Sequence, residues 1–334
     1  FSPDGKKIAY LHNRHEIRVW DIEAGTSTVA LPSDMFYSYA DGDHSFDWSP
    51  DSRWLAANLF SRGRMFIGTV GLVAADGSHG PVDIANSGYE GNSPNFAMKG
   101  GAVLWASERY GERSHGSWGA EMDVIATFLN QDAYDRFRLS KEEHQLRKEL
   151  EEKRKEREKD KKKDEAKKDD APEKPADDAK NGQDDDSKDK DAKKKDDKKV
   201  EPIEIDWDGL ELRTERLTIH SSTLGDFALT DEGDKLFYLA RFERGFDLWV
   251  RDFREESTKI LAKLNANDAR MEMSKDGKSI FILANGSLSK IDASSGDRKT
   301  ISFSADLNVD ESTERQRLFE HVWRQTLQTF YRPD

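Results

Sequence analysis

The stretch Phe1–Ile8, FSPDGKKI, decides the fold, because its pattern returns along the chain. A bulky residue is followed by Ser, by a turn centred on Asp and Gly, and by a short apolar run. Related stretches begin at Trp48 (WSPDSRWL), Phe96 (FAMKGGAV), Leu229 (LTDEGDKL) and Met273 (MSKDGKSI). The starts are 47, 48, 133 and 44 residues apart. Repeats of roughly 40–50 residues are typical of β-propellers and related arrays.

Each copy predicts a β-hairpin. Pro fixes φ, Asp hydrogen-bonds back to the backbone, and Gly accepts a positive φ, so the motif makes a tight turn. The apolar run after the turn suits a strand that is covered on both faces. These predicted strands are Ile8–Leu11, Leu55–Leu59, Val103–Trp105, Leu236–Ala240 and Ile280–Leu283.

A second element follows each copy at a similar distance, and it reads as a strand that enters an Asp-containing turn. Its positions are Val19–Gly25, Leu72–Gly77, Asp123–Thr127, Leu248–Asp252 and Leu288–Gly296. Two hairpins per unit predict four-stranded blades, and hence an all-β fold of the β-propeller class. The alternative is a β-sandwich with coincidental turns.

The spacing of 133 residues indicates an insertion in the third unit. Removing residues 130–206 leaves about 56 residues, which is the length of one blade. We therefore expect five blades over residues 1–310, interrupted at about 138–202. We expect the first blade to lack its outermost start, and the propeller to be incomplete, with further blades of a six- or seven-bladed ring upstream.

The insertion is almost entirely charged. Residues 141–200 hold 22 basic and 22 acidic residues, so the net charge of −13 lies in the rest of the chain. Ser140–Glu143 has the capping-box pattern, which predicts a solvated helix that ends near Asp170. The Asp/Lys/Ala stretch at Asp177–Lys199 cannot bury enough surface to fold. Two interpretations stay open: an arm that holds a partner or gates an opening, and a solvated loop.

The last segment, 311–334, differs from the blades. Apolar residues recur at helical spacing over Glu314–Tyr331, and Ser312 or Thr313 is the expected N-cap. A helix with a wide apolar face needs a partner surface. We therefore expect the first helix of a following domain, with a helix docked on the propeller as the alternative.

Composition excludes several classes of function. The chain has no Cys, so disulfides, thiolate metal sites and a Cys nucleophile are ruled out. The acidic folded part argues against nucleic acid as a partner, and no apolar run is long enough to span a membrane. A cytoplasmic location is expected, with a periplasmic one as the alternative, because the chain starts inside a repeat and its natural N-terminus is expected upstream.

Few residues suggest chemistry within this chain. His12 and His15 have a two-His spacing, and Asp41–Asp47 gathers acidic residues, but neither has the ligand pattern of a metal site. Ser114–Trp118 places serines beside a His without a nucleophile elbow. We expect no catalytic residue, no cofactor and no metal here.

Three residues of one long loop are the candidate peptide-contacting residues. Arg109, Arg113 and His115 lie between two predicted strands. Such loops surround the opening of a propeller, where guanidinium groups contact carboxylates well. A solvated loop without this role is the alternative.

The residues also resemble a known family. FSPDGKKI is the signature of TolB-type, WD40-like propellers, and Trp118–Glu143 with the tail Glu314–Asp334 resembles the second propeller of tricorn-type proteases. The resemblance covers nearly the whole chain except the low-complexity insertion. It implies a serine peptidase of oligopeptides whose nucleophile lies in a catalytic half that follows the propellers, so no catalytic residue transfers to this chain.

The resemblance further implies the partners. They are peptide substrates, the catalytic domains that are absent from this sequence, and further copies in a homo-oligomer of the full-length protein. The propeller itself would filter or channel peptides. The alternatives are a stand-alone TolB-like module that binds another protein, and the propeller of a prolyl-oligopeptidase-type enzyme, which the helical tail fits poorly.

Overall fold

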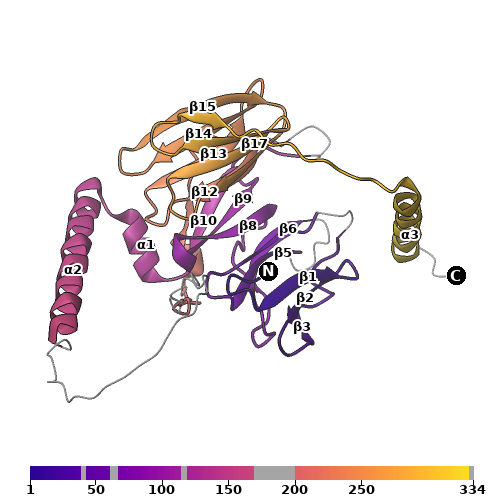
Figure 1. The fold of residues 1–334 in the computed structure, drawn as a ribbon, viewed down its shortest axis with the longest axis horizontal. Helices are drawn as coiled ribbons and strands as arrows, with labels where there is room; N and C mark the ends of the chain where they lie inside the picture. The colour runs from indigo at the N-terminus through magenta and orange to yellow at the C-terminus, as the bar shows by residue number, and fades with distance from the viewer. Residues whose placement is uncertain (39–42, 61–66, 114–118, 169–199, 331–334) are drawn as a thin grey trace, which may run out of the picture. The chain divides into compact units, whose positions relative to one another are not determined.

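The fold is described by a computed structural model, which covers residues 1–38, 43–60, 67–113, 119–168 and 200–330 (Figure 1). The chain divides into two compact units. One unit comprises residues 1–137 and 202–334 and contains all the strands, and the other comprises residues 138–201.

Five antiparallel sheets follow one another in chain order and are called blades 1 to 5. Blade 1 contains β1 (Lys7–His12), β2 (Glu16–Asp21) and β3 (Thr26–Leu31). Blade 2 contains β4 (Phe46–Trp48), β5 (Trp54–Phe60), β6 (Gly68–Ala74) and β7 (Val82–Asp83). Blade 3 contains β8 (Gly91–Ala97), β9 (Ala102–Ser107), β10 (Asp123–Phe128) and β11 (Thr214–Arg216). Blade 4 contains β12 (Thr223–Leu229), β13 (Lys235–Arg241), β14 (Phe246–Asp252) and β15 (Ser257–Ala266). Blade 5 contains β16 (Ala269–Met273), β17 (Ser279–Ala284), β18 (Ser287–Asp292) and β19 (Arg298–Thr300).

The repeated motif forms the predicted hairpin turn between the first two strands of a blade. In blade 2, the Ser49 amide donates to the Trp54 carbonyl over 2.9 Å, and the Ser49 hydroxyl donates to the Asp51 carboxylate over 2.5 Å. The same Ser-to-Asp bond recurs between Ser274 and Asp276. The turn ends in the left-handed region, which Gly277 adopts at φ +67° without strain. The hairpin and the five-blade prediction are confirmed.

The degraded copy in blade 3 makes a different turn. A 3-10 turn, η1 (Met98–Gly100), joins β8 to β9, and its three residues all have positive φ. Gly100 is required there, because a Cβ at this position would lie 2.4 Å from the Ile203 side chain.

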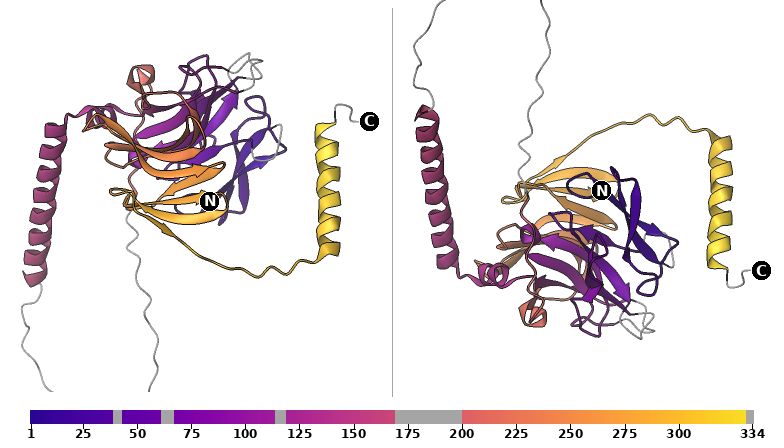
Figure 2. Two further views of the ribbon diagram at one scale, coloured as in Figure 1. Left: turned by 90° about the horizontal axis from the view of Figure 1, so that it is seen from above. Right: turned by 90° about the horizontal axis from the view of Figure 1, so that it is seen from below.

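The core lies between consecutive blades. Four apolar clusters fill the contacts of blade 1 with 2, 2 with 3, 3 with 4, and 4 with 5. The views in Figures 1 and 2 agree that each sheet lies beside the next one in the chain. Within the described residues, no apolar cluster joins blade 5 to blade 1.

Blade 1 has three strands, with β1 at the open edge of the order β1-β2-β3. In the complete blades, the first strands contact one another, β4 with β8 and β12 with β16. The position that blade 1 lacks is therefore an inner one. The prediction of a missing outermost strand is wrong, because strand order runs outward from these contacting first strands.

The insertion interrupts blade 3 between β10 and β11. Its chain enters through α1 (Gln131–Arg138), and Arg254 of blade 4 donates to the carbonyls of Phe137 and Arg136. Its chain returns through η2 (Leu210–Arg213), before which Trp207 stacks on His79 with 4.8 Å between ring centroids. The segments that flank the insertion on either side are thus attached to the blades by specific contacts.

The separate unit contains α2 (Lys141–Lys168). The predicted capping box is confirmed, since the Ser140 amide donates to the Glu143 carboxylate and the Glu143 amide donates to the Ser140 hydroxyl. Hydrogen bonding of the Glu143 carboxylate to the Ser140 amide and hydroxyl lowers the pKa of Glu143. The low-complexity stretch Asp177–Lys199 lies outside the described residues, as do all of residues 169–199.

The last helix, α3 (Glu311–Thr329), begins earlier than predicted. Its N-cap is Asp310, whose carboxylate accepts from the amides of Ser312 and Thr313, so the expected cap at Ser312 or Thr313 is wrong. The apolar residues of α3 are more than half exposed: Leu318, Phe319, Val322, Trp323, Leu327 and, just after it, Phe330. Among the described helices, none is long and apolar enough to cross a membrane.

Candidate functional site

The candidate residues lie on the connection between β9 and β10, residues 108–122. Neighbouring strands of a sheet are antiparallel, so this connection lies at the end of blade 3 opposite to η1. Its two arms continue the hairpin, with Arg113 bridged to Ala120. His115, the third candidate, lies outside the described residues.

Arg113 and Arg109 differ in what surrounds their guanidinium groups. Arg113 forms an ion pair with Glu108, whose side chain is 5% exposed. The same Glu108 carboxylate accepts from the Glu90 amide over 3.2 Å, so it also ties the loop to the segment before β8. Arg109 is exposed and forms no ion pair with any described residue; its guanidinium lies 5.4 Å from the centroid of the Tyr110 ring. Arg109 is therefore the cation that remains available for an anionic group.

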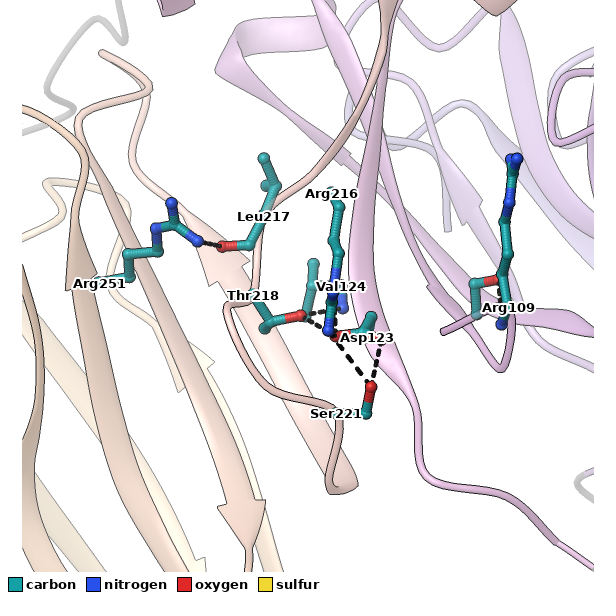
Figure 3. A network of polar contacts seen from close by, with 9 residues as sticks. Arg109, Asp123, Val124, Arg216, Leu217, Thr218, Ser221 and Arg251 are labelled. Carbon is teal, nitrogen blue, oxygen red and sulfur yellow. Dashed lines mark hydrogen bonds and ion pairs between the residues drawn. The ribbon is translucent and has the colours of Figure 1, made fainter. Parts of the chain in front are cut away.

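A buried carboxylate organises the base of this loop. Asp123, the first residue of β10, is fully buried, and its carboxylate accepts four hydrogen bonds from three side chains (Figure 3). The Arg216 guanidinium donates to Oδ1 through Nε at 2.9 Å and Nη2 at 2.8 Å. The Thr218 hydroxyl donates to Oδ1 at 2.6 Å, and the Ser221 hydroxyl donates to Oδ2 at 2.7 Å. A buried charge needs such partners, and this one has them.

The carboxylate cluster reaches the loop through an aromatic ring. The Arg216 guanidinium lies 4.7 Å from the centroid of Tyr110, within the range of a cation–π contact. Tyr110 is 49% exposed. Its ring therefore contacts two guanidinium groups, that of Arg216 at the base and that of Arg109 on the loop.

The same cluster lies at the contact between blades 3 and 4. Residues 217–222 join β11 to β12, and Leu217 within them is fully buried. Arg251 of β14 donates to the Leu217 carbonyl over 2.9 Å. Burial raises the pKa of the nearby Tyr238 phenol to about 12, although Arg251 opposes this shift, so the phenol stays neutral near pH 7. The connection between the two blades is therefore held by Asp123 of blade 3, through Thr218 and Ser221, and by Arg251 of blade 4.

These loops together form one polar and aromatic surface, which we call the blade-3 rim. Hydrogen bonds join its segments, because the Glu108 amide donates to the Glu90 carbonyl and the Met122 and Ser222 backbones pair. Each of the exposed apolar side chains on the rim is just under half exposed. The rim consists of Tyr89, Arg109, Tyr110, Arg216 and Ile219.

The other candidate motifs show no such assembly. His12 contacts the Asn13 amide group at 3.1 Å, in a turn where Asn13 and Arg14 have positive φ. His44 is partly buried and packs against Phe36, with 3.8 Å between ring centroids. Within the described part of the chain, no three His, Asp or Glu side chains gather in a way that would hold a metal ion. Residues 41–42 and 114–118 of the other two motifs lie outside the described residues.

Sequence reasoning missed the buried cluster. Asp123 and its partners Arg216, Thr218 and Ser221 are separated by 93–98 residues, across the whole insertion. One signal was present: Asp123 is a charged residue at the head of the otherwise apolar strand DVIATF, where an unpaired carboxylate would be costly. That signal requires a cationic partner but does not say which one.

Comparison with known proteins supports the fold. No protein-family model matches the chain, and no curated protein matches it. The chain is similar to the crystal structure of the tricorn protease, with a TM-score of 0.63 and 12% identity, over 99% of this chain and 28% of that chain. It is also similar to a protein assigned as TolB from Agrobacterium tumefaciens, with a TM-score of 0.50 and 9% identity, over 90% of this chain and 78% of that chain.

These similarities are distant in sequence. At 12% and 9% identity they establish the fold alone. The chain spans about 28% of the length of the tricorn protease chain that it matches. The chain thus has a β-propeller fold of the class found in the tricorn protease and TolB.

Proposed function

We propose that this chain is a propeller segment of a tricorn-like serine peptidase, where it filters or channels oligopeptides and supports the catalytic domains. The similarity to the tricorn protease over 99% of this chain and the resemblance of Trp118–Glu143 and Glu314–Asp334 support this assignment. In this proposal, residues 1–310 with the insertion at about 138–202 form the propeller segment. Residues 311–334 begin the following domain, which would cover the exposed apolar face of α3.

The blade-3 rim is the observation that carries the peptide-binding part of the proposal. Arg109 offers a guanidinium group with no carboxylate partner among the described residues. Tyr89 and Ile219, on segments that are hydrogen-bonded to the two ends of this loop, add half-exposed apolar surface to the rim. Such a combination fits an extended peptide, whose carboxylate binds the guanidinium group and whose side chains pack on the apolar surface.

Peptide titration tests this function. Short peptides with a free carboxyl terminus are titrated into residues 1–334, and their amidated forms serve as the matched ligand control. We expect weak binding of the free acids, a several-fold loss for the amides, and a similar loss for the free acids with Arg109→Gln. The exposed Arg270→Gln variant, on a blade 5 strand, is the control substitution. Equal binding of acids and amides, or an unchanged affinity for Arg109→Gln, would contradict the proposal.

Catalysis is assigned to other parts of the protein. Purified residues 1–334 are expected to leave fluorogenic oligopeptides uncut under conditions in which they bind. Cleavage that co-purifies with the chain and survives further purification would contradict this assignment.

The second candidate is a stand-alone TolB-like module that binds another protein. It is favoured by the match to the TolB structure, 78% of whose length the chain spans. The continuation of the reading frame separates the two candidates. A catalytic peptidase half after Asp334 supports the first, and a stop codon shortly after Asp334 supports the second.

A further inference from the structure

The position of Arg109 depends on few contacts outside its own loop. Its amide donates to the Ser107 hydroxyl over 3.2 Å, and its guanidinium lies near the Tyr110 ring. Gly111 follows in a tight turn, where a Cβ would lie 1.9 Å from the Glu121 carbonyl oxygen. The ring of Tyr110 is the side chain through which this turn meets the buried cluster below it.

The guanidinium group of Arg216, below the ring, is held by several hydrogen bonds, unlike that of an exposed arginine. Arg216 is 31% exposed, yet both Nε and Nη2 donate to the fully buried Asp123. Nη2 also donates to the Ser221 hydroxyl, at 3.3 Å. The Arg216 guanidinium therefore has one orientation, and the face that it offers to Tyr110 is set before any peptide arrives.

The connection 217–222 reinforces this arrangement. Thr218 donates its hydroxyl to Asp123 and accepts from the Val124 amide over 3.2 Å. The Thr218 side chain thus spans β10 and the connection to β12. Arg251 contacts the same connection at the Leu217 carbonyl, but no contact of Arg251 reaches Tyr110 among the described residues.

We infer that Asp123 and Arg216 are positioning residues for Arg109, and that they act through the ring of Tyr110. Asp123 fixes the Arg216 guanidinium, Arg216 fixes the ring, and the ring holds the turn that presents Arg109 at the rim. The inference rests on the proposed function for its ligand, but its structural part stands on the contacts alone. It predicts that the rim loses affinity when the ring is lost, even where the blades stay folded.

The structural part is tested without any peptide. In the 15N NMR spectrum of residues 1–334, the Nε–H signal of Arg216 should be protected from exchange and shifted by the Tyr110 ring current. Tyr110→Phe keeps the ring and should retain the shift, whereas Tyr110→Leu should abolish it and speed hydrogen exchange at the Gly111 amide. An Arg216 signal that is identical in the wild type and Tyr110→Leu overturns the inference.

The functional part is tested by affinity for a free-acid peptide. Tyr110→Phe should bind like the wild type, and Tyr110→Leu should bind about three- to fivefold more weakly, as expected for an exposed cation–π contact. Asp123→Asn should weaken binding at least as much. The matched control is Arg251→Met, which loosens the same connection at Leu217 and should lower thermal stability without changing peptide affinity.

Two results separate failure of the inference from failure of the proposed function. If Arg251→Met weakens binding as much as Tyr110→Leu, the effect reflects general loosening between the blades, and the positioning role is overturned. If the wild type binds no peptide, the proposed function fails, and the Arg216 signal still decides whether the ring is held as inferred.

Discussion

The turn at Ser49–Trp54 and the cluster beneath the blade-3 rim both hold buried polar groups at the end of a sheet. They differ in where in the sequence the hydrogen-bond partners lie. In the turn, one fully buried Ser hydroxyl accepts from the amides of Arg53 and Trp54 and donates to Asp51, all within six residues. Beneath the rim, the buried carboxylate of Asp123 accepts hydrogen bonds from residues more than 90 positions away.

The difference shows which parts of the fold the local sequence encodes. A turn whose partners are five residues apart needs only its local motif, and it recurs in the four blades that keep the hydroxyl and the Asp. The cluster of Asp123 with Arg216, Thr218 and Ser221, which we call the clamp, forms only after blades 3 and 4 have come together. The rim is therefore specific to one place in the molecule, and its energy depends on the tertiary structure.

The largest expected effect comes from removing the clamp. Asp123→Ala leaves the Arg216 guanidinium without its carboxylate and strips Thr218 and Ser221 of their acceptor. Breaking a buried ion pair by removing one partner costs about 3–5 kcal/mol. Since Arg216 is partly exposed, we expect about 3 kcal/mol by urea denaturation. A loss below about 1 kcal/mol, the size of an ordinary hydrogen bond, would show that the clamp is not a distinct source of stability.

A third region sharpens the comparison through pH. His44 precedes β4, and burial lowers the pKa of its imidazole to about 4. Phe36 and Phe46 face the ring, and neither ring nitrogen has a hydrogen-bond partner among the described residues. The adjacent Asp43 carboxylate opposes the shift, and no other titratable group among the described residues contributes to it.

The sign of the pH effect follows from which state binds more protons. Between the ordinary pKa of about 6.5 and the folded value of about 4, the unfolded chain binds a proton on His44 that the folded chain does not. Stability should therefore fall as the pH drops through this window, by roughly 2 kcal/mol between pH 7 and pH 4.5. Urea denaturation at pH 7 and pH 4.5 measures it, with His44→Phe as the control. A pH profile that His44→Phe leaves unchanged would contradict this assignment.

The contribution of the Asp-containing turns to stability should change in a separate, more acidic pH range. The Ser294 hydroxyl and the amides of Ser294 and Ser295 lower the pKa of Asp292 to about 2. Its contribution is present above the ordinary pKa of 3.8 and is lost as the pH falls toward 2. The pH dependence thus distinguishes a group stabilised by local hydrogen bonds from one that is buried without them.

The smallest expected effect is the loss of a single turn bond. Ser49→Ala leaves two amides and the Asp51 carboxylate without their shared hydroxyl, which should cost about 1 kcal/mol. The less buried copy, Ser274→Ala, should cost less, because water can replace more of the lost hydrogen bonding. Urea denaturation of both variants checks the order. A larger loss for Ser274→Ala would show that burial does not set the cost.

What the sequence could predict follows the same division. The hairpins, the five blades and the insertion in the third blade follow from local signals such as WSPDSRWL and the spacing of its copies. The N-cap of α3 was misplaced by two or three residues, because Asp310, Ser312 and Thr313 all suit a cap, and only the backbone shows which carboxylate is used. The order of strands within a blade was also misjudged for blade 1.

The candidate site could be predicted only in part. The position of Arg109 and Arg113 on one long loop was evident from the flanking strands. Glu108 pairs with Arg113 and leaves Arg109 available because of how the loop closes. Two arginines four positions apart in the sequence do not indicate which one pairs. The domain boundaries near residues 138, 202 and 310 stay predictions, as do the compartment and the homo-oligomer.

The most direct test of the account maps where a peptide binds. Hydrogen exchange of residues 1–334 is measured with and without a saturating free-acid peptide. The account predicts protection at residues 84–91, 107–113 and 216–222, the segments that carry the residues of the blade-3 rim, and none at the turns 49–54 and 274–279. Protection at the turns instead of the rim would contradict it.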